Sequence, residues 1–350
     1  MVDHQTTSVG PRLAHLVRRH FLWLLLGCYA GATWWPKPGL ILRQWISLPS
    51  GLIDLPLSLP LLLLALMLFC AALLTDWSQL RSVLQHPLVL GLALLAVWLG
   101  PALLVWAAGF VLPWAVADQA TTGLLVGLAL VAAMPVANSS VGWTQSGDGN
   151  LALGLALVVL SISLSPLVTP LLLRLLAMSL SPSEQAYCEA LVNRFSGLFF
   201  IMWVILPTAA GLVCRYLLTA ERVARVGHWI TLASAAALLL LNYVNSALAL
   251  PEVADLSTAL LLTTTLLAIA LSAVGLFIGW ALARFLQLSD MTRTALLFGL
   301  SMKHTGLALV LAAVVLASEP PAILMIVLAT LIQHLLAAFV QWFLQRAPAH

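Results

Sequence analysis

The chain has 350 residues, of which 62% are hydrophobic and only 8% are charged, and its mean hydropathy is +1.07. Ordinary soluble domains hold about 25% charged residues, so this composition excludes a water-soluble globular protein. The formal net charge of +3 is small and scattered, which excludes a nucleic-acid-binding surface. The composition therefore predicts a protein of the lipid bilayer.

The first predicted element follows a basic N-terminal segment. Arg12, Arg18 and Arg19 precede the apolar stretch 21–33, and no convincing small-residue cleavage site follows, so we expect a retained membrane helix and not a removed signal peptide. Apolar windows long enough to cross a ~30 Å hydrocarbon core then recur along the chain. They predict ten transmembrane helices, near residues 20–35, 56–75, 87–111, 119–147, 150–178, 196–219, 228–249, 257–286, 291–317 and 321–345.

An even number of spans places both termini on one side of the membrane. With that side as the cytoplasm, ten Lys and Arg residues lie in cytoplasmic loops and four in the opposite loops. This asymmetry follows the positive-inside rule and predicts an inner-membrane protein with both termini in the cytoplasm. The one remaining cation, Lys303, is the only fixed charge that the sequence places deep inside a span, which makes it the first candidate for a functional site.

The fourth predicted span is interrupted. Pro135 removes a backbone donor, and the side chains of Asn138, Ser139 and Ser140 compete for backbone hydrogen bonds, so a continuous helix is not expected. These three polar residues and Thr144 either line a solute path or cap the broken helix ends. Both interpretations remain open from the sequence.

The ninth predicted span contains a second interruption, bracketed by two glycines that are predicted to break the helix. The glycines are Gly299 and Gly306, and the polar residues between them are Ser301, Lys303, His304 and Thr305. Polar groups at mid-membrane are costly, so these residues are candidates for binding a solute or an ion. The histidine has no second ligand at helical spacing, and we expect neither a metal site nor a cofactor.

The two interruptions lie about half the chain apart, each in the fourth span of a five-span half. Because five is odd, the halves have opposite topology, which predicts two inverted five-helix repeats, 1–178 and 179–350, with helices 4 and 9 broken. Half-helix N-termini near the bilayer centre attract anions. The pattern favours a secondary transporter whose partners are a small organic anion and the bilayer.

The residues around both interruptions resemble the bile acid:sodium symporter family. The stretch 134–173, MPVANSSVGWTQSGDGNLALGLALVVLSISLSPLVTPLLL, is similar to a family segment through Pro135, Gly149, Asn150, Pro166, Thr169 and Pro170. The stretch 293–308 is similar to a second segment through Met302, Thr305, Gly306 and Leu307. The resemblance implies crossing broken helices, core and panel bundles formed from both halves, and uptake of organic anions with sodium.

The sodium ligands that the resemblance implies are mostly replaced. Val141 follows Ser140 where the family has Ser-Asn, and the other replaced positions are Ala96, Gly154, Val158, Gly299, Lys303 and His304. We hypothesise that Lys303 stands in for the bound cation, which makes transport independent of sodium. In a second version Lys303 loads and releases a proton, and His304, with an ordinary pKa of about 6.5, joins the relay.

Several alternatives remain open from the sequence. The first alternative is a sodium- or proton-coupled symporter with a remodelled site, and the second is a non-transporting membrane receptor. The third is an intramembrane hydrolase that uses Ser140 and His304. A nucleotide-binding loop, a zinc-binding His-Glu-x-x-His pair and a Gly-x-Ser-x-Gly elbow are all absent, which argues against an enzyme. Lys303 also has a purely structural interpretation, in which it locks the packing of the break.

The sequence GLFIG at 275–279 predicts a close helix contact.

Overall fold

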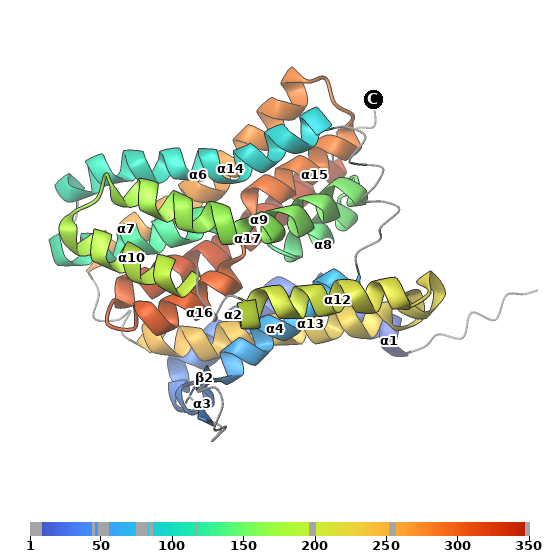
Figure 1. Ribbon diagram of the computed structural model, residues 1–350, viewed down its shortest axis with the longest axis horizontal. Coiled ribbons are helices and arrows are strands. Elements are labelled where there is room, and N and C mark those ends of the chain that lie inside the picture. The colour runs from blue at the N-terminus through green and yellow to red at the C-terminus, as the bar shows by residue number, and fades with distance from the viewer. Residues whose placement is uncertain are drawn as a thin grey trace, which may run out of the picture. The chain divides into compact units, whose positions relative to one another are not determined.

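A computed structural model describes residues 9–43, 46–47, 56–74, 83, 87–115, 118–195, 201–251 and 257–346. Within these residues the protein is helical apart from one short antiparallel pair, β1 (Ile46–Ser47) with β2 (Pro56–Leu57). The prediction of an all-helical membrane protein is confirmed. The helices fall into two compact units, and each is described by itself (Figure 1).

The first unit comprises Met1–Thr75 and Met202–Ala247. Its helices are α1 (Val9–Arg19), α2 (Phe21–Trp34), α3 (Pro36–Leu42), α4 (Leu59–Leu73), α12 (Leu206–Leu217) and α13 (Ala220–Ala249), with the π-helical turn η1 (Ile201–Ile205) at its border. Gly211 allows α12 to approach α4, because a Cβ there would lie 2.7 Å from the Cβ of Ala72. Tyr29 on α2 donates a hydrogen bond to Asn242 Oδ1 on α13 at 3.0 Å, which fixes these two helices together.

The second unit comprises Asp76–Ile201 and Leu248–His350. Its helices are α6 (Pro87–Ala115), α7 (Asp118–Ala133), α8 (Ser139–Ser146), α9 (Leu151–Ala177), α10 (Pro182–Phe195), α14 (Thr258–Phe285), α15 (Asp290–Ser301), α16 (Thr305–Val315) and α17 (Pro320–Arg346). A Cβ on Gly279 would lie 2.8 Å from the carbonyl oxygen of Leu296, so α14 packs backbone to backbone on α15. The predicted close contact at GLFIG is confirmed.

In the part of the chain that the structure describes, five helices are long and apolar enough to cross a membrane: Pro87–Leu112, Leu151–Ala177, Ala220–Ala247, Thr258–Phe285 and Pro320–Leu344. Five shorter apolar helices are Phe21–Trp34, Leu59–Leu73, Thr121–Ala133, Ile201–Leu217 and Thr305–Val315. The protein is therefore a multi-pass membrane protein, while the count of ten spans and the inverted repeat stay predictions. The seventh span was expected near residue 228, but its helix begins at Ala220 because the charged turn with Glu221 and Arg222 is helical as well.

The broken helices form the interior of the second unit. Every residue of 123–137 and of 294–312 is buried, so neither stretch has an exposed face. A helix that is apolar and buried all round is enclosed by other helices. The surrounding helices α6 and α9 carry the exposed apolar side chains, including Leu95, Leu99, Leu167 and Leu171.

Candidate functional site

The first interruption separates α7 from α8. Helix α7 ends at Ala133, the next helix begins at Ser139, and Pro135 lies in the non-helical segment between them. Proline has no N–H to continue the ladder, and the residue before it is driven out of the helical conformation. The last carbonyl groups of α7 therefore lack helical donors and need other partners.

Side chains from α6 and α9 supply partners for the open backbone. The Ala133 carbonyl accepts hydrogen bonds from Thr169 Oγ1 at 2.7 Å and from the indole N–H of Trp98 at 3.1 Å. The N–H of Val136 donates to Ser161 Oγ at 3.0 Å. In a bilayer, where water does not reach such groups, these side chains make the interruption stable.

The second interruption separates α15 from α16. Helix α15 ends at Ser301, Met302 is extended with φ −110° and ψ 116°, and the next helix begins at Thr305. His304 is the N-cap of α16, since its Nδ1 accepts a hydrogen bond from the N–H of Leu307 at 3.2 Å. The imidazole thus replaces one of the missing helical acceptors.

The two glycines predicted to break this helix do not do so. Gly299 lies inside α15 and Gly306 is the second residue of α16, so the break occupies the three residues between the helices. A Cβ on Gly299 would lie 2.7 Å from Leu157 Cδ1, so this glycine permits close packing against α9. Its role is helix contact and not helix termination.

The two interruptions pair with each other as a short antiparallel bridge between Val136 and Lys303. The N–H of Ala137 donates to the Met302 carbonyl at 3.0 Å, and the N–H of His304 donates to the Pro135 carbonyl at 2.9 Å. Each break thereby satisfies backbone groups of the other, which neither half of the chain can do alone.

The ammonium of Lys303 lies at this crossing, and the side chain is only 3% exposed. Its Nζ donates to the carbonyl oxygens of Val97, Ala132 and Met134, the last two at 3.2 Å each. An ammonium has three N–H donors, so these three oxygens, hereafter the carbonyl cage, satisfy it completely. Lys303 therefore neither snorkels nor faces lipid.

The charge of Lys303 is compensated by dipoles and not by a carboxylate. The three groups that accept hydrogen bonds from its Nζ are all backbone carbonyl oxygens. Ala132 and Met134 stand at the C-terminal end of α7, where the helix dipole is negative. The cage is thus a set of three backbone oxygens that holds one ammonium group.

The other predicted site residues lie on the helices that flank the crossing. Ser301 and Thr305 are the buried last and first residues of α15 and α16, and Ser140 and Thr144 are buried on α8. Thr144 Oγ1 donates to the Ser140 carbonyl at 2.9 Å, a bond within its own helix. Asn138 and Ser139, at the start of α8, are half-buried.

The geometry does not form the serine–histidine pair that a hydrolase requires. Ser140 Oγ and His304 Nε2 are both buried without a hydrogen-bond partner, and hence they do not bond to each other. A nucleophile without its base within hydrogen-bonding distance has no activated oxygen. The hydrolase interpretation is not supported.

Several residues of the site were missed from the sequence. Gln333 on α17 accepts a hydrogen bond from the N–H of Lys303 at 3.0 Å, and Trp98, Ser161 and Thr169 hold the first interruption. One signal was available for Val97, because Pro101 four residues later leaves its carbonyl without a helical donor. Single polar side chains on apolar helices gave no such signal.

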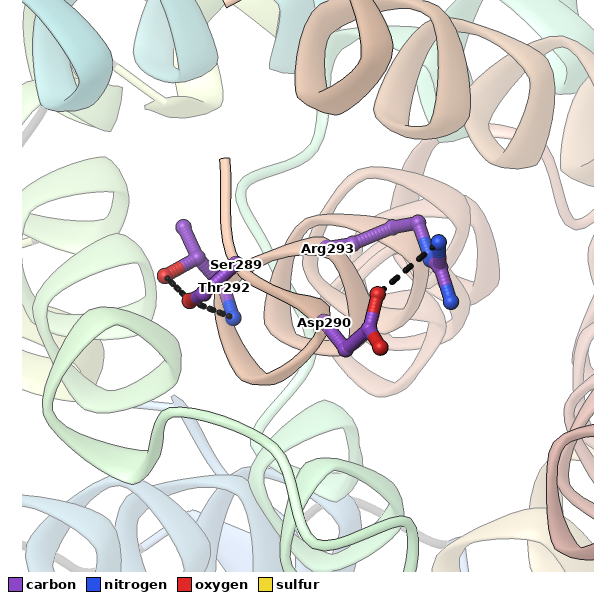
Figure 2. Close-up of polar contacts among 4 residues, drawn as sticks. All are labelled: Ser289, Asp290, Thr292 and Arg293. Atoms are coloured by element: carbon purple, nitrogen blue, oxygen red, sulfur yellow. Dashed lines mark hydrogen bonds and ion pairs between the residues drawn. The ribbon is translucent and has the colours of Figure 1, made fainter. Parts of the chain in front are cut away.

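The N-terminal end of α15, opposite the end at the break, is capped by Ser289 (Figure 2). Ser289 Oγ accepts a hydrogen bond from the N–H of Thr292 at 3.4 Å, and Arg293 pairs with Asp290 at 3.0 Å. The N–H of Asn150 donates to the Met291 carbonyl at 2.8 Å, which ties this end to the turn before α9. The half-helix that leads to Lys303 is therefore fixed at both ends.

Comparison with known proteins identifies the group to which this architecture belongs. Residues 61–256 match the sequence model of the sodium bile acid symporter family, which is more than half of the chain. The chain belongs to the sodium bile acid symporter family. It is also 26% identical over 283 residues to the uncharacterized protein YbaS of Bacillus subtilis (strain 168), a match that spans 81% of this chain and 87% of that protein.

Membership of the sodium bile acid symporter family has direct consequences. Members are membrane transporters, so the chain is a symporter-like transporter of a small solute and not an enzyme. The matched residues include the whole first interruption, whereas Lys303 lies beyond them. The crossing of the two breaks is thus known here from the structure, and the role of Lys303 has to be argued from its contacts.

Proposed function

We propose that the protein carries a small organic anion across the inner membrane without sodium, and that Lys303 is a built-in replacement for the coupling cation. The observation that supports this is the carbonyl cage, in which one ammonium takes three backbone oxygens at the crossing. Sodium also binds through several hard oxygen ligands. An ammonium tethered to the chain occupies the same dipoles without being released.

The solute is proposed to bind at the N-terminal ends of α8 and α16. His304 accepts with Nδ1, so the neutral ring carries its proton on Nε2, and that donor has no partner. Ser140 Oγ is likewise buried and unpaired. Half-helix N-termini and unpaired donors favour a carboxylate, with Asn138, Ser139 and Thr144 of the α8 segment completing its surroundings.

The topology that accompanies this function remains part of the proposal. Ten spans in two inverted repeats, 1–178 and 179–350, place both termini in the cytoplasm according to the distribution of Lys and Arg. Each of the two compact units takes residues from both proposed repeats. In such carriers one bundle moves against another around a fixed site.

The test is uptake of a set of radiolabelled mono- and dicarboxylates by proteoliposomes, in sodium buffer and in N-methylglucamine buffer. We expect uptake of at least one acid at equal rates in both buffers, and a loss of about tenfold or more in Lys303→Ala, since a charge-assisted hydrogen-bond network is removed. Lys37→Ala is the matched control, because Lys37 is exposed on α3. Adding n-propylammonium, which replaces the deleted atoms, is expected to restore uptake in Lys303→Ala alone.

Other results would redirect the proposal. Strict sodium dependence in the parent protein contradicts the replacement of the cation by Lys303. Uptake that follows the pH gradient and is lost in Lys303→Gln favours proton loading at Lys303. Carboxylate binding without flux favours the receptor interpretation.

A further inference from the structure

Gln333 on α17 lies on the outer edge of the Lys303 segment. The antiparallel bridge uses the Met302 carbonyl and the His304 N–H, which point toward the first interruption. The N–H of Lys303 points the opposite way, as alternate groups of an extended strand do, and donates to Gln333 Oε1 at 3.0 Å. The side-chain amide of Gln333 thus accepts the backbone hydrogen bond that a neighbouring strand would otherwise accept.

The other end of the same amide reaches α16. Gln333 Nε2 donates to Thr305 Oγ1 at 3.4 Å, and Thr305 is the first residue of that half-helix. The N–H of Thr305 also donates to the Lys303 carbonyl at 2.7 Å. One buried side chain therefore contacts the residue whose ammonium fills the cage and the residue at which the solute-facing half-helix begins.

We propose that Gln333 is a positioning residue that couples the carbonyl cage to the N-terminus of α16. This rests on the proposed function, because it assigns the cage to a cation and the helix start to the solute. Gln333 does not donate to the cage oxygens, so it acts through the backbone of Lys303. When the ammonium is in the cage, the Lys303 backbone is fixed. The Gln333 amide, which is bonded to that backbone and to Thr305, then also restricts the motion of Thr305 and of the first turn of α16. Coupling between two such sites typically changes an affinity about 5- to 150-fold.

The test measures amide hydrogen exchange in peptides that cover residues 299–308, with n-propylammonium as the probe of the cage. In Lys303→Ala the cage is without its ammonium, and we expect the probe to slow exchange at the start of α16 by about threefold or more. Tetramethylammonium, a cation without N–H donors, is expected to have no effect. In Lys303→Ala with Gln333→Met the probe is expected to leave exchange at the start of α16 unchanged.

A matched control and a second variant show whether the response to the probe depends on the two contacts of Gln333. Gln341→Met, on the same helix, removes a hydrogen bond from Nε2 to the Ser146 carbonyl at 3.1 Å, and the response to the probe is expected to persist. Thr305→Val removes only the second contact of Gln333 and is expected to abolish the response even if Gln333→Met does not fold. A response that persists in both Gln333→Met and Thr305→Val overturns the proposal, as does the absence of any response in Lys303→Ala. Because exchange is measured without transport, sodium-dependent uptake would overturn the proposed function and leave this test intact.

Discussion

Pro101 and Lys303 meet at one carbonyl group, that of Val97. In a regular helix this carbonyl would accept from the N–H of residue 101, but proline has none. Lys303 Nζ donates to the Val97 oxygen in its place. A proline within a long apolar helix thus creates one of the three acceptors for a cation that is provided from the other half of the chain.

Replacing Pro101 by alanine tests this relationship. Pro101→Ala restores an N–H that competes with Lys303 for the Val97 carbonyl, so α6 becomes more regular while the ammonium loses an acceptor. A hydrogen bond to a charged group contributes about 1.5–3 kcal/mol, and we expect uptake in proteoliposomes to fall about tenfold. The control is Pro166→Ala in α9, where the freed carbonyl of Ile162 already accepts from Ser165 Oγ at 2.7 Å. Equal uptake by Pro101→Ala and the parent would show that the Val97 contact is dispensable.

A second prediction concerns the side chain that holds the first interruption open. Ser161→Ala removes the acceptor of the Val136 N–H and leaves that donor buried without a partner. The expected loss of stability is about 1–3 kcal/mol, measured as a lower midpoint of thermal unfolding in detergent. Ser163→Ala is the control, because Ser163 is exposed and donates only within α9, to the Val159 carbonyl at 2.8 Å. Its midpoint is expected to match the parent, and equal losses in the two variants would count against the role given to Ser161.

The interruptions were predictable from the sequence because their chemistry is local. Proline has no backbone N–H, and a polar or charged residue at mid-membrane has a high free-energy cost that usually reflects a function. Pro135 and Lys303 could therefore be singled out without a structure. The exact place of the second break could not. Gly299 gives the same local signal whether it ends a helix or admits a neighbouring side chain, and only the position of Leu157 decides between them.

The partners of the site were not predictable for a related reason. Gln333 and Ser161 are uncharged polar residues on mainly apolar helices, and such residues commonly form interhelical hydrogen bonds of no special function. Their importance comes from which backbone groups they reach, and those contacts join segments far apart in the chain. The carbonyl oxygens of the cage have no sequence signal apart from Pro101, because every residue has a carbonyl.

A third prediction follows from the close contact of α14 with α15. A Cβ on Gly275 would overlap the backbone of Leu300 and lie 2.6 Å from Ser301 Cα, immediately before the second break. Gly275→Ala must therefore separate the helices, with an expected cost of about 1–3 kcal/mol and a marked loss of uptake. Gly91→Ala is the control within a membrane helix, because nothing lies within 4 Å of the added atom. If Gly275→Ala unfolds at the temperature of the control, the packing of α14 does not position the break.

The last prediction concerns how α8 is held. The indole N–H of Trp143 donates to His334 Nδ1 on α17 at 3.2 Å, and the indole stacks on Phe298 with ring centroids 6.2 Å apart. Because α8 has only eight residues, it cannot be stable by its own hydrogen bonds and depends on such contacts.

A double-mutant cycle with Trp143→Phe and His334→Leu measures this bond. Phenylalanine keeps an aromatic ring but removes the N–H, and leucine removes the acceptor, so each single variant breaks this hydrogen bond. We expect each to lower stability in detergent by about 1–3 kcal/mol, with a coupling energy near 1 kcal/mol between them. Trp106→Phe, which alters an exposed tryptophan on α6, is the control and is expected to leave stability unchanged. Strictly additive effects in the cycle would mean that the bond between Trp143 and His334 does not hold α8. Stacking of Trp143 on Phe298 and the bond from Gln341 Nε2 to the Ser146 carbonyl would then be the contacts that position the proposed anion site.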